Sequence, residues 1–230
     1  MKIVVGLGNF GDRYAYTFHN MGFLAAECLA DKLGLKFDRR ECDALIAVGY
    51  RGGEKLVIAK PLTYMNLSGV AVKQLLAKYK VEPKDLIVMF DDADLPKGSV
   101  RVRLKGSAGT HNGMRNIIEK IGTLDFPRVR IGIGPVPERV PIADYVLSDV
   151  PKAERQLLFD AFSAAADDAD GTRLFGVPSS LPDGGEELLL QFDPLAADTG
   201  FLDEIDGYAY FFFGADPRDF DGIRLVIDRS

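Results

Sequence analysis

Three residue types are scarce in this sequence of 230 residues, which has no tryptophan, only two histidines and only two cysteines. Cys28 and Cys42 form no C-x-x-C or other metal-type spacing, and the sequence contains no H-E-x-x-H segment. We therefore expect neither a metal nor another cofactor. So few cysteines exclude a disulfide-rich scaffold and are typical of a reducing compartment.

Long hydrophobic stretches are also absent. No apolar run approaches the roughly 20 residues that cross a membrane as a helix. The first residues, MKIVVGLGN, have the pattern of a strand and a turn, and they lack the separate basic, apolar and small-residue regions of a signal peptide. We therefore expect a cytoplasmic protein without a membrane partner.

The composition is that of an ordinary folded protein, with 47% hydrophobic and 27% charged residues. These fractions exclude collagen, a long coiled coil and wholesale disorder. The net charge of -6 is unevenly distributed, because residues 1–150 carry 22 basic and 17 acidic residues whereas residues 151–230 carry 6 and 17. A mildly basic first part is compatible with a nucleic-acid partner, but charge alone does not separate that interpretation from an acidic surface on the last third.

Apolar runs typical of buried strands alternate with segments of helical periodicity along residues 1–168. Ser68 is the candidate N-cap of the second helix. Because strands and helices alternate without segregating, the predicted fold class is α/β, with three α/β/α layers around a mixed, twisted sheet. We expect strands at 2–8, 44–50, 55–59, 86–90, 99–104 and 128–133, and helices at 21–33, 68–80, 113–121 and 151–168.

The character of the sequence changes after residue 170. The segment GTRLFGVPSSLPDGG is rich in Gly, Pro and Ser and indicates a boundary. We therefore divide the chain into a domain at 1–170 and an acidic, β-rich appendage at 171–230. The appendage has twelve acidic and four basic residues, and ELLLQFD, GYAYFFFG and GIRLVID predict three short strands. A segment of this size is marginal as an independent domain, so we expect it to dock or to pair with something.

The first motif, GLGNFG at residues 6–11, has the G-x-G-x-x-G spacing of dinucleotide-binding loops. In such loops a helix begins within the motif, so that its N-terminus faces the pyrophosphate. Here no helical pattern begins before residue 21. A Gly-rich turn, or a turn that presents Asn9 at the end of a strand, is favoured, and a nucleotide-dependent enzyme stays a minor alternative.

The two histidines, His19 and His111, both lie in polar, turn-prone segments. A general base that works near neutral pH is most often a histidine, so any such base has these two candidates. Asp91, Asp92 and Asp94 follow the expected strand at 86–90, where acidic residues of α/β proteins commonly form sites. They could bind a divalent cation, orient a histidine or cap a solvated turn, and their spacing leaves these roles open.

The asparagines and the lack of a candidate serine or cysteine nucleophile limit the reactions that we expect of this protein. Asn9, Asn66 and Asn112 each follow or open an expected element near one end of the sheet. A neutral amide both donates and accepts hydrogen bonds, which suits a substrate with peptide groups. The sequence has no G-x-S-x-G elbow, and neither cysteine has the context of a nucleophile. Hydrolysis would therefore have to use an activated water.

Five ordered segments, at the same spacing, resemble the bacterial peptidyl-tRNA hydrolase family. They are GLGNFGDRYAYTFHNMGF, KPLTYMNLSG, FDDADLPKGSVRVR, KGSAGTHNGMRNII and FPRVRIGIGP, followed by ADYVLS. The resemblance covers residues 1 to about 168. It implies the hydrolysis of the ester between a peptide and the 3′ end of tRNA, with peptidyl-tRNA as the partner, no cofactor and a monomeric state.

The resemblance also implies a role for each matching residue. His19 resembles the base that activates water, Asp91 the carboxylate that orients this base, and Asn9 a further member of the catalytic set. His111 precedes Asn112 in the family's motif and has a supporting part. The substrate-lining positions correspond to Tyr14, Met65, Asn66 and Asn112. The basic positions for tRNA phosphates correspond to Arg101, Arg103, Lys105 and Arg130.

The sequence departs from this family at Phe10, Phe18 and Thr110, where the family usually has Pro, Arg and Gly. Phe10 loses a fixed φ beside Asn9, Phe18 places an apolar ring beside the base, and Thr110 is disfavoured if its φ is positive. A non-catalytic RNA-binding protein of the same fold is therefore the main rival. The appendage is foreign to the family and weakly resembles the C-terminal end of YwqG-like proteins. Its acidity motivates the hypothesis that it competes with tRNA for the basic face.

Overall fold

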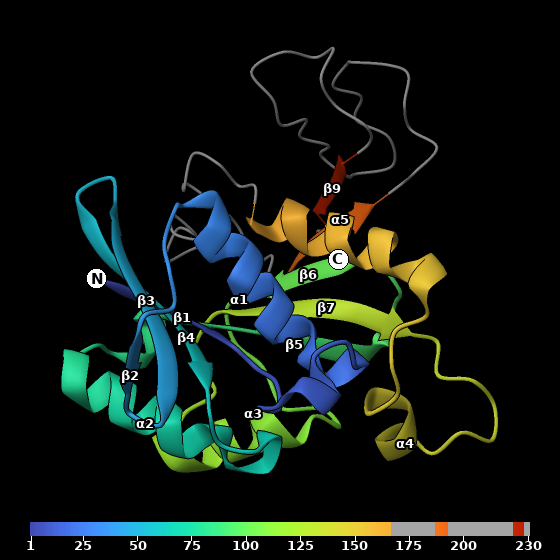
Figure 1. Cartoon of the computed structure of the whole chain (residues 1–230), viewed down its shortest axis with the longest axis horizontal. Helices are drawn as coiled ribbons and strands as arrows, with labels where there is room; N and C mark the ends of the chain where they lie inside the picture. Colours follow the sequence, from blue (N-terminus) through green and yellow to red (C-terminus); the bar gives the residue numbers. More distant parts are fainter. Residues whose placement is uncertain (167–186, 193–222, 228–230) are drawn as a thin grey trace.

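A single mixed sheet runs through the protein (Figure 1), in a computed structural model that describes residues 1–166, 187–192 and 223–227. The sheet order is β2-β3-β4-β1-β5-β7-β6-β8-β9. The central neighbours β4, β1, β5 and β7 are parallel, and the outer pairs are antiparallel. The strands are β1 (Lys2–Gly6), β2 (Arg39–Glu41), β3 (Ala44–Arg51), β4 (Glu54–Pro61), β5 (Leu86–Pro96), β6 (Val100–Arg103), β7 (Arg128–Gly134), β8 (Glu187–Phe192) and β9 (Ile223–Ile227).

Helices cover both faces of this sheet, with α1 and α5 on one face and α2 and α3 on the other (Figure 1). The helices are α1 (Met21–Lys32), α2 (Ser68–Tyr79), α3 (Asn112–Ile121), α4 (Ile142–Val146) and α5 (Arg155–Ala166), and short 3-10 turns include η2 (Phe18–Asn20) and η3 (Met65–Leu67). The expected three-layer α/β/α class is therefore confirmed. No helix in the described ranges is long and apolar enough to cross a membrane.

Alternating side chains of the central strands build two separate cores. On β1, Val4 packs with the α1 and α5 layer, whereas Ile3 and Val5 pack with α2 and α3. Successive side chains of a strand point to opposite faces, and a strand that is covered on both faces is apolar throughout. Burial of each such side chain contributes about 1.5–3 kcal/mol, so these buried strands provide a rigid base for the loops at their ends.

The glycines at the start of the chain serve close packing of β1 against α1. A Cβ at Gly6 would lie 2.1 Å from the carbonyl oxygen of Gly22, and a Cβ at Gly8 would lie 2.5 Å from the ring of Phe23. Helix α1 begins only at Met21, so its N-terminus does not open within the glycine motif as a dinucleotide fold requires. Packing therefore accounts for two of the three glycines.

Several expected boundaries are wrong for identifiable reasons. Ser68 is the first residue of α2, and Leu67 occupies the N-cap position; the Ser68 hydroxyl donates to the Met65 carbonyl at 2.8 Å. Strand β5 continues through the acidic residues because Asp91 and Asp92 pair with β7. The last helix is preceded by a separate 3-10 turn at Lys152–Glu154. The short elements β2 and α4 were not expected, since neither has an apolar run long enough to show a period.

The appendage contributes two strands that are described. Strand β8 pairs antiparallel with β6, and β9 pairs antiparallel with β8. These correspond to two of the expected strands, whereas the expected strand at 207–214 lies outside the described residues. The backbone of β8 therefore continues the sheet from β6, the strand that carries Arg101 and Arg103. The domain division at residue 170 stays a prediction.

Candidate active site

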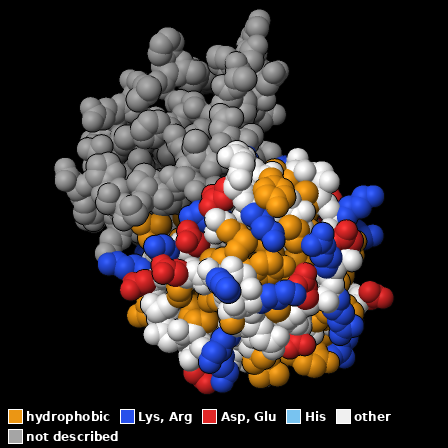
Figure 2. Space-filling view, turned by 90° about the vertical axis from the view of Figure 1, so that its left-hand side faces the viewer, with side chains coloured by type: hydrophobic (Ala, Val, Ile, Leu, Met, Phe, Trp, Pro, Cys, Tyr) orange, Lys and Arg blue, Asp and Glu red, His pale blue; other side chains and the backbone are white. Residues whose placement is uncertain are grey.

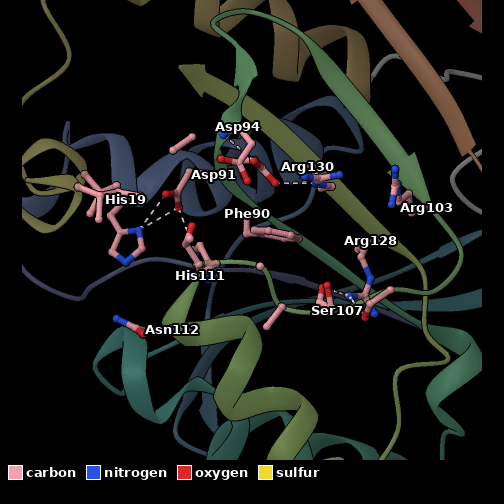
Figure 3. A pocket seen from close by; sticks show the side chains of 18 of the residues that line it. His19, Phe90, Asp91, Asp94, Arg103, Ser107, His111, Asn112, Arg128 and Arg130 are labelled. Carbon is pink, nitrogen blue, oxygen red and sulfur yellow. Dashed lines mark hydrogen bonds and ion pairs between the residues drawn. The ribbon is translucent and has the colours of Figure 1, made fainter. Parts of the chain in front are cut away.

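Several of the predicted site residues, among them His19, Asp91 and Asn112, line a cavity of about 270 Å³ at one edge of the sheet (Figure 3). Asn9 lies three residues beyond β1, and His19 lies on η2, between β1 and α1. Asp91 projects from β5, and His111 precedes the first residue of α3. The parallel central strands bring these segments together because their carboxyl ends meet at the same edge.

A carboxylate shared by two histidines forms the centre of the site. His19 Nδ1 lies 2.9 Å and 3.0 Å from the two carboxylate oxygens of Asp91. His111 Nε2 lies 3.2 Å from Asp91 Oδ1 (Figure 3). All three residues are buried, and the two imidazole centroids are 4.9 Å apart. Since His19 Nδ1 faces the carboxylate, the other ring nitrogen of His19 is left for the cavity, which His19 lines.

Asp91 is ionised in this environment. Burial alone would raise the pKa of Asp91, but the adjacent His19 and His111, together with their hydrogen bonds, hold this pKa well below its usual value. An ionised carboxylate only accepts hydrogen bonds. Both imidazoles must therefore present an N–H to Asp91, and the pair of His19 and Asp91 can orient and polarise a water for proton abstraction.

The second histidine also caps helix α3. His111 occupies the N-cap position, and its Nδ1 accepts a hydrogen bond from the backbone N–H of Met114 at 3.1 Å. Gly113 permits the close approach of this helix, because a Cβ there would lie 2.6 Å from Met65 Sδ and 3.0 Å from His111 Cε1. The His111 ring is therefore held at Nδ1 by the start of α3 and at Nε2 by Asp91 of β5.

Hydrogen bonds to Asn9 connect the loop after β1 to the neighbouring segments. Its Oδ1 accepts from the backbone N–H of Met65 at 2.9 Å. Its own backbone N–H donates to Asn20 Oδ1 at 2.8 Å, and Asn20 Nδ2 donates back to the Asn9 carbonyl at 3.0 Å. Since the Met65 N–H fixes the side-chain oxygen Oδ1 of Asn9, the other group of this amide, Nδ2, can act as a donor. Asn20 was not among the predicted site residues, because a single asparagine in a turn carries no specific signal for this positioning role.

The other predicted substrate residues differ in exposure. Met65 is buried between the loop of Asn9 and α3, whereas Asn66 and Asn112 are exposed. Asn112 lines the cavity, and its Oδ1 accepts from Arg115. Tyr14 is half-buried and lies under the Arg13 guanidinium, 4.4 Å from the carbon to the ring centroid. The cavity lining includes Asn112 but not Tyr14, Met65 or Asn66, which belong to the neighbouring Asn9 side of the edge.

The cavity continues from the two histidines to basic residues on β6 and β7. Arg103 and Arg130 line it, as does Arg128. Arg101 lies directly opposite Arg130 in the strand pairing, and Lys105 is exposed on the following loop. Arg130 donates to Asp92 through Nε, so the charge of Asp92 offsets part of the positive charge that Arg130 offers to a phosphate. The predicted basic positions therefore lie close together on β6, β7 and the loop after β6.

Arg128 has a structural part that the sequence analysis missed. This arginine is 1% exposed and donates to the carbonyls of Gly106, Ser107 and Leu124. Burial, followed by the nearby Arg130 and Arg103, lowers the pKa of Arg128 to about 10. It thereby holds the wall of the cavity that leads to His111. The alternation of basic and apolar residues along β7 could have indicated on which face of the sheet Arg128 lies, but not that its side chain is buried.

The face of the protein around β2 and α2 has a mixed distribution of charges. Figure 2 shows the side at the left of Figure 1, around β2 and α2, where Lys and Arg side chains are interspersed with acidic and hydrophobic ones. The part of that face that the structure describes carries no patch of a single sign.

Of the three residues that depart from the resembled family, Thr110 lines the cavity, whereas Phe10 and Phe18 do not. Phe10 is exposed. Phe18 turns into the core, where its ring stacks on Tyr145 with centroids 4.6 Å apart. Thr110 does not have a positive φ. The concern that Thr110 is strained is therefore wrong, and the Phe18 ring does not line the cavity.

The cluster at the centre of the site also contains side chains of the types that bind metals. Within the described ranges, one group has suitable donors, because ligand atoms of His19, Asp91 and His111 lie within 4.8 Å of one another. These atoms are already engaged, since Asp91 accepts from both rings and His111 Nδ1 accepts from Met114. Hydrogen bonds alone account for the arrangement. The absence of a metal stays a prediction.

Fold and site together have the features of a hydrolase without a serine or cysteine nucleophile. A mixed α/β sheet carries a buried histidine–carboxylate pair beside a cavity, with neutral amides on one side and arginines on the other. Such a pair can activate water, and such amides can position an ester or a peptide.

Comparison with known proteins identifies the family. The sequence profile of peptidyl-tRNA hydrolases matches residues 3–175. Over 168 residues, which are 73% of this chain and 89% of the relative, the chain is 48% identical to a peptidyl-tRNA hydrolase of Chloroflexus aggregans. It is 44% identical over 193 residues to that of Elusimicrobium minutum, covering 84% and 99% of the two chains. The crystal structure of peptidyl-tRNA hydrolase from Acinetobacter baumannii matches with a TM-score of 0.72 and 34% identity, over 77% of this chain and 91% of that one. The chain belongs to the peptidyl-tRNA hydrolase family.

Proposed function

We propose that this protein hydrolyses the ester bond of peptidyl-tRNA and releases free tRNA and peptide. The observation that carries the proposal is the buried contact between His19 Nδ1 and the Asp91 carboxylate, 2.9 Å and 3.0 Å from its two oxygens. Membership of the family supports the substrate class. The non-catalytic RNA-binding alternative gains nothing from the structure, because a protein that only binds RNA has no need of this pair.

In this mechanism Asp91 accepts the Nδ1–H of His19, so that the lone pair is on Nε2. His19 Nε2 takes a proton from a water, and the water oxygen attacks the ester carbonyl carbon. The tetrahedral intermediate then collapses, the carbon–oxygen bond to the tRNA breaks, and the 3′ oxygen leaves with the proton from His19. The products are a free tRNA hydroxyl and a peptide carboxylate, whose carboxyl group releases the remaining proton of the water to solvent.

Amide groups stabilise and position the reacting ester. The Asn9 side chain, whose Oδ1 is held by the Met65 N–H, can donate through Nδ2 to the developing oxyanion or to the water. A fixed donor of this kind typically contributes about 10²–10³ in rate. Asn66 and Asn112, both exposed, bind the peptide main chain, while Met65 and Tyr14 line the substrate.

The tRNA lies on the basic side of the cavity. Arg103 and Arg130 line the cavity together with His19, and Arg101 and Lys105 lie on the same strand and the loop after it. Contacts with phosphates are largely independent of sequence and weaken with salt. Since every site residue comes from one chain, we expect a monomer to be active, and we place it in the cytoplasm, where translation produces its substrate.

The test is hydrolysis of N-blocked aminoacyl-tRNA by the wild type and by the His19→Ala variant, with a chelator present. We expect cleavage by the wild type, and a loss of cleavage in the variant with tRNA binding retained. Wild-type binding that is sensitive to salt, without cleavage, would instead support the RNA-binding rival. Equal cleavage by both proteins would refute His19 as the base.

A further inference from the structure

The turn that carries His19 is attached to the chain just after α4. The backbone N–H of Phe18 donates to the carbonyl of Ser148 at 3.2 Å, and an isolated antiparallel bridge pairs Thr17 with Asp149. These backbone contacts join two segments that lie about 130 residues apart in the sequence. The proposed mechanism makes no use of them.

A pair of aromatic side chains adds a second connection between the same two segments. The Phe18 ring stacks on the ring of Tyr145, with centroids 4.6 Å apart and an interplanar angle of 22°. Both rings are buried, and the Tyr145 hydroxyl donates to the Ile133 carbonyl of β7 at 2.5 Å. Tyr145 is thus held at its hydroxyl by β7, while one face of its ring holds Phe18.

Helix α4, which carries Tyr145, also borders the cavity. Three of its five residues line the cavity together with His19, whereas Tyr145 is stacked on Phe18 and does not line it. The stack therefore joins a wall of the cavity to the residue that immediately precedes His19.

The turn is anchored on the other side of His19 as well. The next residue, Asn20, exchanges two hydrogen bonds with the backbone of Asn9. The His19 side chain has two torsions, and its Nδ1 is held by Asp91 (Figure 3). Once the turn and Nδ1 are fixed, the place of Nε2 in the cavity is fixed too.

We infer that Phe18 and Tyr145 form a positioning pair for the hydrolysis proposed above: their stack fixes the turn of His19 against α4, and with it the distance from His19 Nε2 to the water and the ester. The inference rests on the proposed function. A general base has to lie within hydrogen-bond reach of its proton, and a displacement of about 1 Å can lower a rate by about 100-fold. Neither aromatic residue lines the cavity, so both act through His19.

Four variants separate positioning from stability. Tyr145→Leu and Phe18→Leu each remove the stack and leave an apolar side chain in the core. Tyr145→Phe keeps the ring and loses only the hydroxyl. The control is Ile46→Ala, which opens a cavity at a fully buried position of β3, two strands away from β5 and in the other core.

The first measurement is single-turnover hydrolysis of N-blocked aminoacyl-tRNA, well below the melting temperature of each variant. We expect the rate constant to fall by about 10- to 100-fold in both leucine variants, with the binding constant for deacylated tRNA unchanged. Tyr145→Phe should recover most of the rate constant. Ile46→Ala should have a lower melting temperature and nearly the rate constant of the wild type.

The double variant Phe18→Leu/Tyr145→Leu tests whether the two residues act as a pair. Its rate constant should be close to that of either single variant, because one stack can be lost only once. If the two single losses multiply in the double variant, or if Ile46→Ala loses as much activity as the leucine variants, the inference is overturned. If Tyr145→Leu does not fold, Phe18→Leu is compared with the control in the same way.

A measurement without substrate separates this inference from the proposed function. The chain has only two histidines, so ¹⁵N-histidine labelling yields two imidazole spin systems, which the His111→Asn variant assigns. We expect the His19 signals to shift and broaden in the leucine variants and to stay unchanged in Ile46→Ala. Unchanged His19 signals in the leucine variants would overturn the inference. Failure of the wild type to cleave peptidyl-tRNA would refute only the proposed function, since the spectrum would still report how His19 is held.

Discussion

The substitution Asp91→Asn tests the geometry of the site most directly. The new amide has one acceptor oxygen and one donor nitrogen, in place of two acceptor oxygens. Met114 holds His111 as a donor, so the amide oxygen will turn to His111. The amide NH₂ group then faces His19 Nδ1, which must become an acceptor. The hydrogen of His19 moves to Nε2, where the lone pair is needed to take a proton from water.

The expected loss is large because the wrong tautomer blocks the reaction while the shape of the site is retained. The equivalent exchange in a serine-protease triad lowers kcat by about 10⁴. The same factor here corresponds to about 5 kcal/mol of transition-state stabilisation. Binding should change little, since Asp91 is buried and 2% exposed and does not face the tRNA side of the cavity.

Single-turnover hydrolysis of N-blocked aminoacyl-tRNA, together with a binding constant for deacylated tRNA, would measure both effects. Asp92→Asn is the matched control, because Asp92 is the neighbouring acid and pairs with Arg130 without contacting His19. We expect kcat of this control to stay within about threefold of the wild type, well below the cost of a hydrogen bond to a charged group. A loss smaller than tenfold in Asp91→Asn, or equal losses in both variants, would show that Asp91 does not orient the base.

The remaining predictions concern stability, the basic face and the appendage. The folded-state pKa of Asp91 is lowered, so its contribution to the free energy of unfolding is present at neutral pH and declines as the pH falls below about 4. Acid unfolding of Asp91→Asn should lack this decline. An identical pH dependence of the variant and the wild type would contradict the lowered pKa. Phe18→Ala removes a ring that is stacked on Tyr145 and should lower the free energy of unfolding by about 3–5 kcal/mol in urea titrations, whereas a change below about 1 kcal/mol would contradict its core position. Arg103→Gln should weaken tRNA binding at low salt and reduce the slope of log K against log salt by about 0.9, with kcat retained; an unchanged slope would remove Arg103 from the phosphate contacts. Deletion of residues 171–230 takes away twelve acidic and four basic residues. If the appendage competes with tRNA for the basic face, the deletion should increase the affinity for tRNA at low salt. Unchanged affinity and activity would refute that hypothesis.

Sequence patterns anticipated the layers but not every boundary. The two-residue period of Ile3, Val4 and Val5 is a local property of one strand, and the structure places its two faces in two cores as expected. Strand β5 was placed too short because its acidic residues do not look like a buried strand. They are strand because β7 pairs with them, and a pairing partner distant in sequence leaves no trace in a local pattern.

The sequence by itself determined the chemistry available to this protein. Two histidines, no suitable nucleophile and a set of asparagines limit hydrolysis to an activated water, and the ordered motifs indicate the family that the comparisons confirm. These conclusions depend only on residue types and their order along the chain.

Only the tertiary structure decided how those groups act together. It brings His19 and His111 side by side onto the carboxylate of Asp91, and it places Asn20 where it supports the backbone of Asn9. It also buries Arg128 as a structural cation, while Arg130 pairs with Asp92. The physical reason is that tautomer, burial and ion pairing depend on distances of a few ångströms between segments far apart in the chain. Such distances are established only when the strands pair and the helices pack.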